Sequence, residues 1–309
     1  MDSLSVIVPC YNEEAVIETT YRRLKSVLTA LDRETHIIFI NDGSDDRTLE
    51  ILTAIAADDK TVKVLSFSRN FGHQAAVTAG IHNCLTDLAI IIDADLQDPP
   101  ELIPDILSCR EREKANVVYC VRRSRAGESR LKLWTARKFY RFLNRLSEVD
   151  FPVDTGDFRL IDSRVMEQFK RFKERGKYIR GLISWVGFRQ VPFYYARDAR
   201  QAGITKYPFK RMFSFAATAL FYFSKKPLLI AVGLGFTAVL IGIICALWYI
   251  FGKIFGYTHA ESGWTSIMIG MIFFGGVQLL TIGVLGQYIG ILFDEIKERP
   301  EYIIEKEIN

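Results

Sequence analysis

Short apolar runs alternate with helically spaced apolar residues along the first half of the chain. Five runs are typical of strands: residues 4–8, 36–40, 62–67, 88–92 and 116–121. Four segments between them have helical spacing: residues 13–31, 46–57, 72–84 and 101–114. Strands that alternate with helices predict an α/β domain with a mostly parallel sheet covered on both faces. Ligands of such domains bind beyond the carboxyl ends of the strands.

Two long apolar runs follow this domain. Residues 228–252 and 264–293 contain no charged side chain, and each exceeds the roughly 20 residues that a helix needs to cross a bilayer. Both are apolar on all faces, which favours membrane spans over two buried core helices. Basic residues precede the first run at positions 206, 210, 211, 225 and 226, whereas the connecting loop holds only Lys253 and Glu261. This asymmetry predicts that the first domain and both termini are cytoplasmic.

Composition agrees with this segregation. Hydrophobic residues make up 49% of the chain although 25% of its residues are charged, and the mean hydropathy is +0.11. The first residues lead directly into an apolar strand, so we expect no signal peptide and no export of the first domain. A net charge of +4 suits anionic lipid and phosphate ligands and does not require nucleic acid. The five cysteines lack zinc-site spacing, and we expect them to be reduced and buried.

An acidic motif follows the predicted strand 88–92. It reads Asp93-Ala94-Asp95-Leu96-Gln97 and places three side-chain oxygens on alternate residues. Mg²⁺ and Mn²⁺ prefer a few such oxygens and leave positions for phosphates, so the motif predicts a metal site. The alternative is a solvated turn before the two prolines that follow.

Other polar groups stand at the predicted strand ends. Tyr11-Asn12, Asp42, Arg69-Asn70 and Asp93 would share one edge of a parallel sheet, which favours a nucleotide site there. Taken singly, Asp42 and Asn12 fit capped turns equally well. Residues 122–145 carry nine basic side chains among aromatic ones, which indicates either a solvated basic helix face or a segment that binds phosphates or membrane. Residues 209–223 resemble an interfacial amphipathic helix.

These motifs resemble a known family. Residues 6–14, Asn41-Asp42-Gly43-Ser44 and residues 93–100 are similar to the inverting family 2 glycosyltransferases of the GT-A (Rossmann-like) fold. Residues 154–160 and 200–207 resemble its polyprenyl-phosphate glycosyltransferases, which include dolichol-phosphate mannose synthase and the bacterial GtrB-type glucosyltransferases. The two apolar runs match the GtrB-like members best. Thr205 departs from the subgroup's frequent Ser but keeps the hydroxyl.

The resemblance and the apolar runs together imply an organisation. We expect a GT-A domain over residues 1–207, a juxtamembrane amphipathic segment over 208–226, two transmembrane helices over 227–293 and a cytoplasmic tail over 294–309. The protein would be a multi-pass protein of the cytoplasmic membrane. Glycines spaced as GxxxG in residues 286–290 favour a homo-oligomer.

The resemblance also implies a role for individual residues. The donor nucleotide would contact Pro9, Tyr11, Glu13, Asp42 and Asp93. The metal, Mg²⁺ or Mn²⁺, would be bound by Asp93, Asp95 and Gln97. Phosphates of donor or acceptor would meet Arg122, Arg200 and Lys206. The catalytic set would be Asp157, Asp95, Arg200 and Lys206. For Asp157 we favour a positioning or charge-stabilising role over that of a general base, because a phosphate monoester is mostly dianionic at neutral pH.

The implied reaction is inverting transfer of a hexose from a nucleotide sugar to a polyprenyl phosphate such as undecaprenyl phosphate. Glucose from UDP-glucose is the expected donor by resemblance alone, and mannose or another sugar remains open. A processive polysaccharide synthase is disfavoured because residues 168–172 lack the Trp of its QxxRW motif. A non-catalytic nucleotide-binding scaffold would not need the acidic set, and a transporter would need a polar path through the spans.

Overall fold

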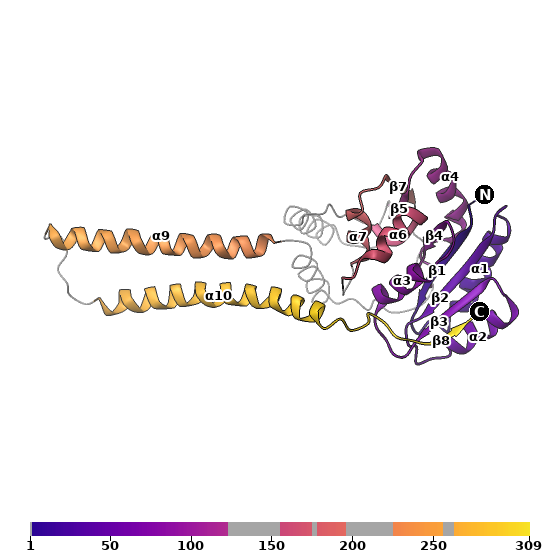
Figure 1. Cartoon of the computed structure of the whole chain (residues 1–309), viewed down its shortest axis with the longest axis horizontal. Helices are drawn as coiled ribbons and strands as arrows, with labels where there is room; N and C mark the ends of the chain where they lie inside the picture. The colour runs from indigo at the N-terminus through magenta and orange to yellow at the C-terminus, as the bar shows by residue number, and fades with distance from the viewer. Residues whose placement is uncertain (1, 123–154, 175–177, 196–224, 256–262) are drawn as a thin grey trace. The chain divides into compact units, whose positions relative to one another are not determined.

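A computed structural model describes residues 2–122, 155–174, 178–195, 225–255 and 263–309. They form two compact units, which are considered separately. The first unit is an eight-stranded sheet with its helices, and it includes the last residues of the chain; the second consists of two long helices (Figure 1).

Four parallel strands at the centre of the sheet confirm the alternation predicted from the sequence. They are β1 (Leu4–Cys10), β2 (Thr35–Asn41), β3 (Val62–Phe67) and β4 (Leu88–Ile91). Three helices connect them: α1 (Ile17–Thr29), α2 (Thr48–Asp58) and α3 (His73–His82). After β4 come η1 (Pro100–Leu102), α4 (Ile103–Glu113) and β5 (Val117–Arg122). β1 is buried at every position, as expected of a strand covered on both faces.

Three strands that the sequence did not announce complete the sheet, whose order is β7-β5-β6-β4-β1-β2-β3-β8. β6 (Thr155–Asp162) lies between β4 and β5 and is antiparallel to both. β7 (Gln190–Tyr195) is parallel to β5 at one edge. β8 (Ile304–Ile308) is antiparallel to β3 at the other. The sheet is therefore mixed, with four neighbouring parallel strands at its centre and a parallel pair, β5 and β7, at one edge.

Helices cover both faces of the sheet (Figure 1). Apolar residues of α1, α2 and α4 form one buried cluster with inward residues such as Val6, Phe39 and Phe158. The opposite face is covered by α3, α6 (Ser163–Arg171) and α7 (Ile179–Trp185). Two of these helices, α3 and α7, bring side chains to the site described below.

Helix α3 packs closely on β1 at Gly80. A Cβ at this position would lie 2.2 Å from Cγ2 of Ile7, inside any normal contact distance. We therefore expect Gly80→Ala to lower the free energy of unfolding by about 1 to 3 kcal/mol, because overpacking exceeds the roughly 1 kcal/mol that a helix gains from Ala over Gly. Thermal unfolding of Gly80→Ala, Ile7→Ala and the double variant checks this. The double variant should lose less than the sum of the single losses; simple additivity would contradict the close packing.

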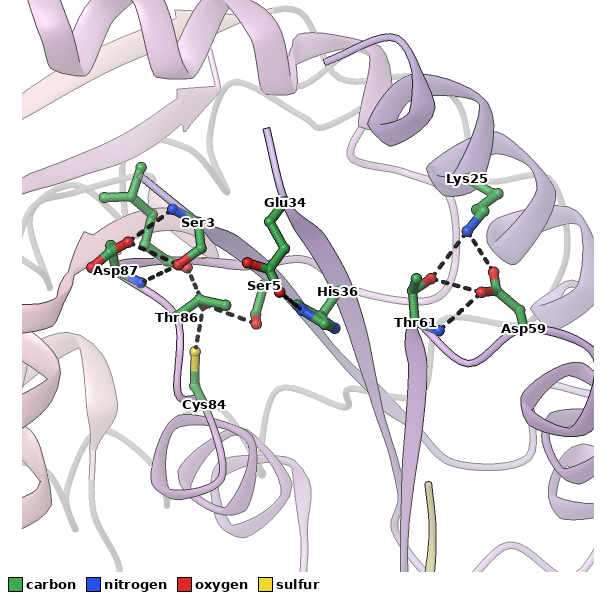
Figure 2. A network of polar contacts seen from close by, with 11 residues as sticks. Ser3, Ser5, Lys25, Glu34, His36, Asp59, Thr61, Cys84, Thr86 and Asp87 are labelled. Atoms are coloured by element: carbon green, nitrogen blue, oxygen red, sulfur yellow. Dashed lines mark hydrogen bonds and ion pairs between the residues drawn. The ribbon is translucent and has the colours of Figure 1, made fainter. Parts of the chain in front are cut away.

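Polar side chains tie together the amino ends of the strands, opposite the edge expected to bind ligands (Figure 2). The amide and hydroxyl of Ser3 both donate to Asp87 at 2.8 Å, which joins the starts of β1 and β4. Before β3, Lys25 lies 2.7 Å from Asp59, and the Thr61 hydroxyl donates to the same carboxylate. This edge is thus occupied by structural hydrogen bonds.

The second unit contains the two predicted apolar helices, α9 (Lys226–Ile254) and α10 (Trp264–Ile296). Both are long and apolar enough to cross a membrane by length and composition. Their apolar side chains are mostly exposed, for example Trp248 at 78% and Leu279 at 71%, which argues against core helices of a soluble protein. Cys245 of α9 is also exposed, so the expectation of five buried cysteines holds only for the four in the sheet domain.

The segment after α10 returns to the sheet, although the sequence analysis assigned residues 294–309 only as a tail. β8 pairs with β3 between Val64↔Ile308 and Phe67↔Ile304. Tyr302 stacks on Phe67 with ring centroids 5.1 Å apart. Charged and polar side chains had concealed this strand, because alternation is weak in IEKEI.

Candidate active site at the carboxyl edge of the sheet

The loops after β1 and β2 lie together, as the strand-end argument predicted. The Asn12 amide donates to the Ser44 hydroxyl at 3.0 Å, and the Asn12 side chain accepts from the Asp45 amide at 2.9 Å. Asn12 has a φ of 56°, a left-handed conformation that Asn tolerates better than most residues. Its side chain therefore links two loops and does not cap α1. Tyr11, 37% exposed, is beside this link.

Asp42 organises the loop after β3. One of its oxygens accepts from the Phe71 amide at 2.7 Å, and the other accepts from the Gly72 amide at 3.0 Å. Burial raises the pKa of the Asp42 carboxyl, and these two hydrogen bonds partly offset the rise. Gly43, with a φ of 63°, allows this approach, since a Cβ there would lie 2.3 Å from the Arg69 carbonyl carbon. The contact of Asp42 with a nucleotide stays a prediction.

Buried groups hold the acidic loop after β4 in place. Leu96 adopts a left-handed φ of 57° and is 1% exposed. Asp98 is fully buried and accepts a hydrogen bond from the Tyr195 hydroxyl of β7. The Thr20 hydroxyl donates to the Ala94 carbonyl at 2.8 Å. Contacts from two elements, β7 and α1, thus fix a backbone conformation that a bulky residue rarely adopts, and the loop is no solvated turn.

The predicted metal ligands lie on this fixed loop. Oδ1 of Asp93 is buried and accepts no hydrogen bond among the described residues, and burial raises the pKa of this carboxyl. Asp95 accepts from the Gln97 amide at 3.2 Å. The described residues contain no group of three His, Cys, Asp or Glu side chains placed to hold a metal. Two carboxylates, one with an unsatisfied oxygen, and the Gln97 amide nevertheless fit a divalent cation that takes its other ligands from phosphates.

The antiparallel strand β6 brings Asp157 to the same edge. Ile91 of β4 pairs with Arg159 of β6. Because the two strands are antiparallel, Asp93, two residues after Ile91, lies opposite Asp157, two residues before Arg159. Sixty-four residues of sequence separate them, yet the register places them side by side. The antiparallel direction explains why a residue at the start of a strand joins residues at strand ends.

Two cationic side chains contact Asp157. Arg180 of α7 donates through Nε to Oδ1 at 2.7 Å and through Nη2 to Oδ2 at 3.1 Å. His73, the first residue of α3, lies with Nε2 3.0 Å from Oδ2 and 3.7 Å from Asp93. Burial opposes ionisation of Asp157, but Arg180 and His73 outweigh it and hold its pKa well below the usual range.

The partners of Asp157 were not predicted. His73 stands just beyond the strand 62–67, where the strand-end rule could have drawn attention to it. Arg180 carries no local signal, because only the packing of α7 brings it to β6. Arg159, two residues after Asp157 on β6, is only 3% exposed and donates to the Gly156 carbonyl at 3.1 Å. Burial lowers the pKa of this arginine to about 10.

The other predicted site residues are placed less directly. Pro9 is buried inside β1, and Glu13 begins the turn into α1, where its amide donates to the Thr48 hydroxyl at 2.9 Å. Arg122 ends β5 at the same edge, and its side chain is outside the described part. Arg200 and Lys206 lie outside the described residues, as do the basic segment 123–145 and the amphipathic segment 209–223.

A pH dependence of stability follows from His73. Burial lowers its pKa, but Asp157 and Asp93 raise it to about 9, so the ion pair stabilises the fold fully below the unfolded pKa of about 6.5 and is lost as the pH rises through 9. The stabilisation of wild type over His73→Asn should therefore fall by about 1 to 2 kcal/mol across this window, a value reduced for solvent screening of a partly exposed ring. Thermal unfolding at pH 6 and 9.5 with a chelator present measures it. A constant difference would contradict the pairing.

Comparison with known proteins identifies the family. The model of glycosyl transferase family 2 matches residues 5–169. The chain is 45% identical over 302 residues to the glycosyltransferase YkcC of Bacillus subtilis (strain 168), covering 98% of this chain and 93% of the relative. It is 38% identical over 304 residues to the bactoprenol glucosyl transferase of Shigella phage SfII, covering 98% and 97%.

The solved glucosyl-3-phosphoglycerate synthase from Mycobacterium tuberculosis, in complex with Mn²⁺, UDP-glucose and phosphoglyceric acid, is 19% identical, with a TM-score of 0.46 over 71% of this chain and 78% of that one. The family match covers more than half of the chain, and the relatives match nearly its whole length. The resemblance seen in the motifs is confirmed, and the chain belongs to the family 2 glycosyltransferases of the GT-A fold.

Proposed function

We propose that this enzyme transfers glucose from UDP-glucose to a polyprenyl phosphate such as undecaprenyl phosphate. The observation that carries the proposal is the similarity, at 37–38% identity and nearly full length, to proteins named bactoprenol glucosyl transferase. The motifs that contain Asp42, Asp93 and Asp157, together with residues 200–207, resemble the same group of glycosyltransferases, which also supports the proposal.

The donor would bind at the carboxyl edge of the sheet. Tyr11, Glu13 and Asp42 would hold the nucleotide, while Asp93, Asp95 and Gln97 would hold Mg²⁺ or Mn²⁺. When bound, such a cation stabilises the charge of the diphosphate as a Lewis acid, which contributes several kcal/mol. Asp93 Oδ1 is buried, lies 3.7 Å from His73 Nε2 and accepts no hydrogen bond from the described residues, which supports this assignment.

In the proposed reaction, an oxygen of the lipid phosphate forms a bond to the anomeric carbon of glucose. The bond from that carbon to the nucleoside diphosphate breaks, its electron pair leaves with the diphosphate, and the configuration inverts. Because the second pKa of a phosphate monoester is near 6, the attacking group is a dianion and no proton has to be removed. Arg122, Arg200 and Lys206 would neutralise phosphate charge.

A membrane location fits this acceptor. Each methylene of a polyprenyl chain exposed to water costs roughly 0.8 kcal/mol, so the enzyme has to reach the lipid at the bilayer. β8, which follows α9 and α10 in the chain, pairs with β3 and so belongs to the sheet domain, which supports an even number of membrane crossings. Two crossings satisfy that requirement. Basic residues before α9 support a cytoplasmic sheet domain.

The test is incubation of the purified full-length protein with radiolabelled UDP-glucose, undecaprenyl phosphate and Mn²⁺ or Mg²⁺. A labelled lipid of low mass is the expected product. A long polymer would indicate a processive synthase, and no product with any nucleotide sugar would indicate a scaffold. Parallel reactions with GDP-mannose and other UDP-sugars identify the donor.

A further inference from the structure

The contacts of Asp157 bear on what this carboxylate can do in the transfer. Oδ1 accepts from Nε of Arg180 at 2.7 Å, and Oδ2 accepts from Nη2 of Arg180 at 3.1 Å and faces His73 Nε2 at 3.0 Å. The Asp157 side chain is only 8% exposed. Each of its oxygens therefore already faces at least one cationic donor. A two-pronged Arg–carboxylate pair is the geometry that fixes a carboxylate most firmly.

The surrounding backbone holds both partners in place. The Gln74 side chain of α3 accepts from the Ile179 amide, the first residue of α7, at 3.0 Å. His73 and Arg180 are the sequence neighbours of these two residues. The start of α3, the start of α7 and β6 are consequently joined around one carboxylate.

A general base needs the opposite arrangement. It must offer an oxygen to the incoming proton and have a pKa near the working pH. Asp157 offers oxygens that already accept hydrogen bonds from fixed cations, and the groups around it also include Asp93 after β4 and Arg159 on β6. The acceptor phosphate, as a dianion, does not need a base.

We propose that Asp157 acts as a fixed anion and not as a proton acceptor, and that His73 and Arg180 are positioning residues that act on the transfer through Asp157. This inference rests on the proposed function for its turnover measurements. In the wild type, Asp157 would keep a constant charge and position beside the sugar while the anomeric carbon becomes positive. Loss of Arg180 would leave the Asp157 carboxylate free to move, although Arg180 itself would not contact the substrate.

Turnover of full-length variants tests the coupling. Arg180→Gln should lower kcat about 100-fold with little change in the KM for donor, and Arg180→Lys, which keeps the charge, should lose about 10-fold. Asp157→Asn should lose about 1,000-fold, and adding Arg180→Gln to it should cost less than about 3-fold more, because residues that act as a unit are not additive. Arg164→Gln, an exposed arginine on α6, is the matched control and should leave kcat unchanged.

Two results would overturn the proposal. One is recovery of Asp157→Asn activity between pH 6 and pH 8.5, which is expected if the wild-type carboxylate removes a proton. The other is full additivity of Arg180→Gln and Asp157→Asn, which is expected if Arg180 binds substrate directly.

Thermal unfolding of the same variants provides a readout independent of activity. Asp157→Asn and Arg180→Gln should each lower Tm, and the double variant should lower it by less than the sum. Additive shifts in Tm would contradict the pairing itself. If the wild type transfers no sugar, the proposed function fails while this cycle still decides whether Asp157 and Arg180 are paired.

Discussion

Asp95→Ala is expected to abolish metal-dependent turnover while the sheet domain stays folded. Asp95 is one of the two carboxylates on the loop after β4 that we assign to the metal, and loss of a ligand to the cation that neutralises diphosphate charge should cost about 3 orders of magnitude or more in kcat. The stability loss should be small, about 1 kcal/mol, the size expected for loss of a hydrogen bond such as the one that Asp95 accepts from the Gln97 amide. Turnover is measured over a range of Mn²⁺ and Mg²⁺ concentrations, alongside Tm.

Two further variants make this result specific. Asp95→Asn keeps an oxygen for the Gln97 amide but loses the charge, so it should be as inactive as Asp95→Ala and closer to wild type in Tm. Asp105→Ala removes an exposed carboxylate of α4 and should leave turnover unchanged. Normal activity of Asp95→Ala at saturating donor would refute Asp95 as a metal ligand and, with it, the assignment of this loop as the metal site.

The acidic loop could be predicted because its evidence is local. Asp93, Asp95 and Gln97 are adjacent in sequence and follow an apolar strand, so neighbouring residues alone indicate both the strand end and the oxygen ligands. The alternation of strands and helices over residues 4–121 is equally local. It predicted β1 to β5 with ends displaced by at most a few residues.

The partners of Asp157 could not be predicted in this way. Their meeting depends on the register of β6 on β4 and on the packing of α3 and α7, which are properties of the folded chain. The family resemblance implied a role for Asp157 itself, but His73 and Arg180 stand 84 and 23 positions away from it. No periodicity in the sequence connects such distant positions.

β8 shows the same limit, and it leads to the second large effect. Its five residues, IEKEI, carry three charges, a pattern that fits a solvated tail as well as an edge strand. The pairing with β3 and the stacking of Tyr302 on Phe67 identify it as an edge strand. A chain that ends before residue 302 should therefore lose stability, whereas a solvated tail would be dispensable.

We expect removal of residues 302–309 to lower the free energy of unfolding by about 3 kcal/mol or more, because it uncovers Phe67 and the β3 edge and removes an aromatic contact. For a domain of this size that is a fall in Tm of about 10 °C. Tyr302→Ala should give a large part of the same shift and remains informative if the truncated chain does not accumulate. Ile303→Ala is the matched control, since this neighbouring side chain is 50% exposed, and it should change Tm by about 1 to 2 °C at most. The truncated protein should still sediment with membranes, because α9 and α10 are intact. An unchanged Tm would mean that β8 contributes nothing to the sheet, and the argument that the chain returns to the side of the catalytic domain would lose its structural support.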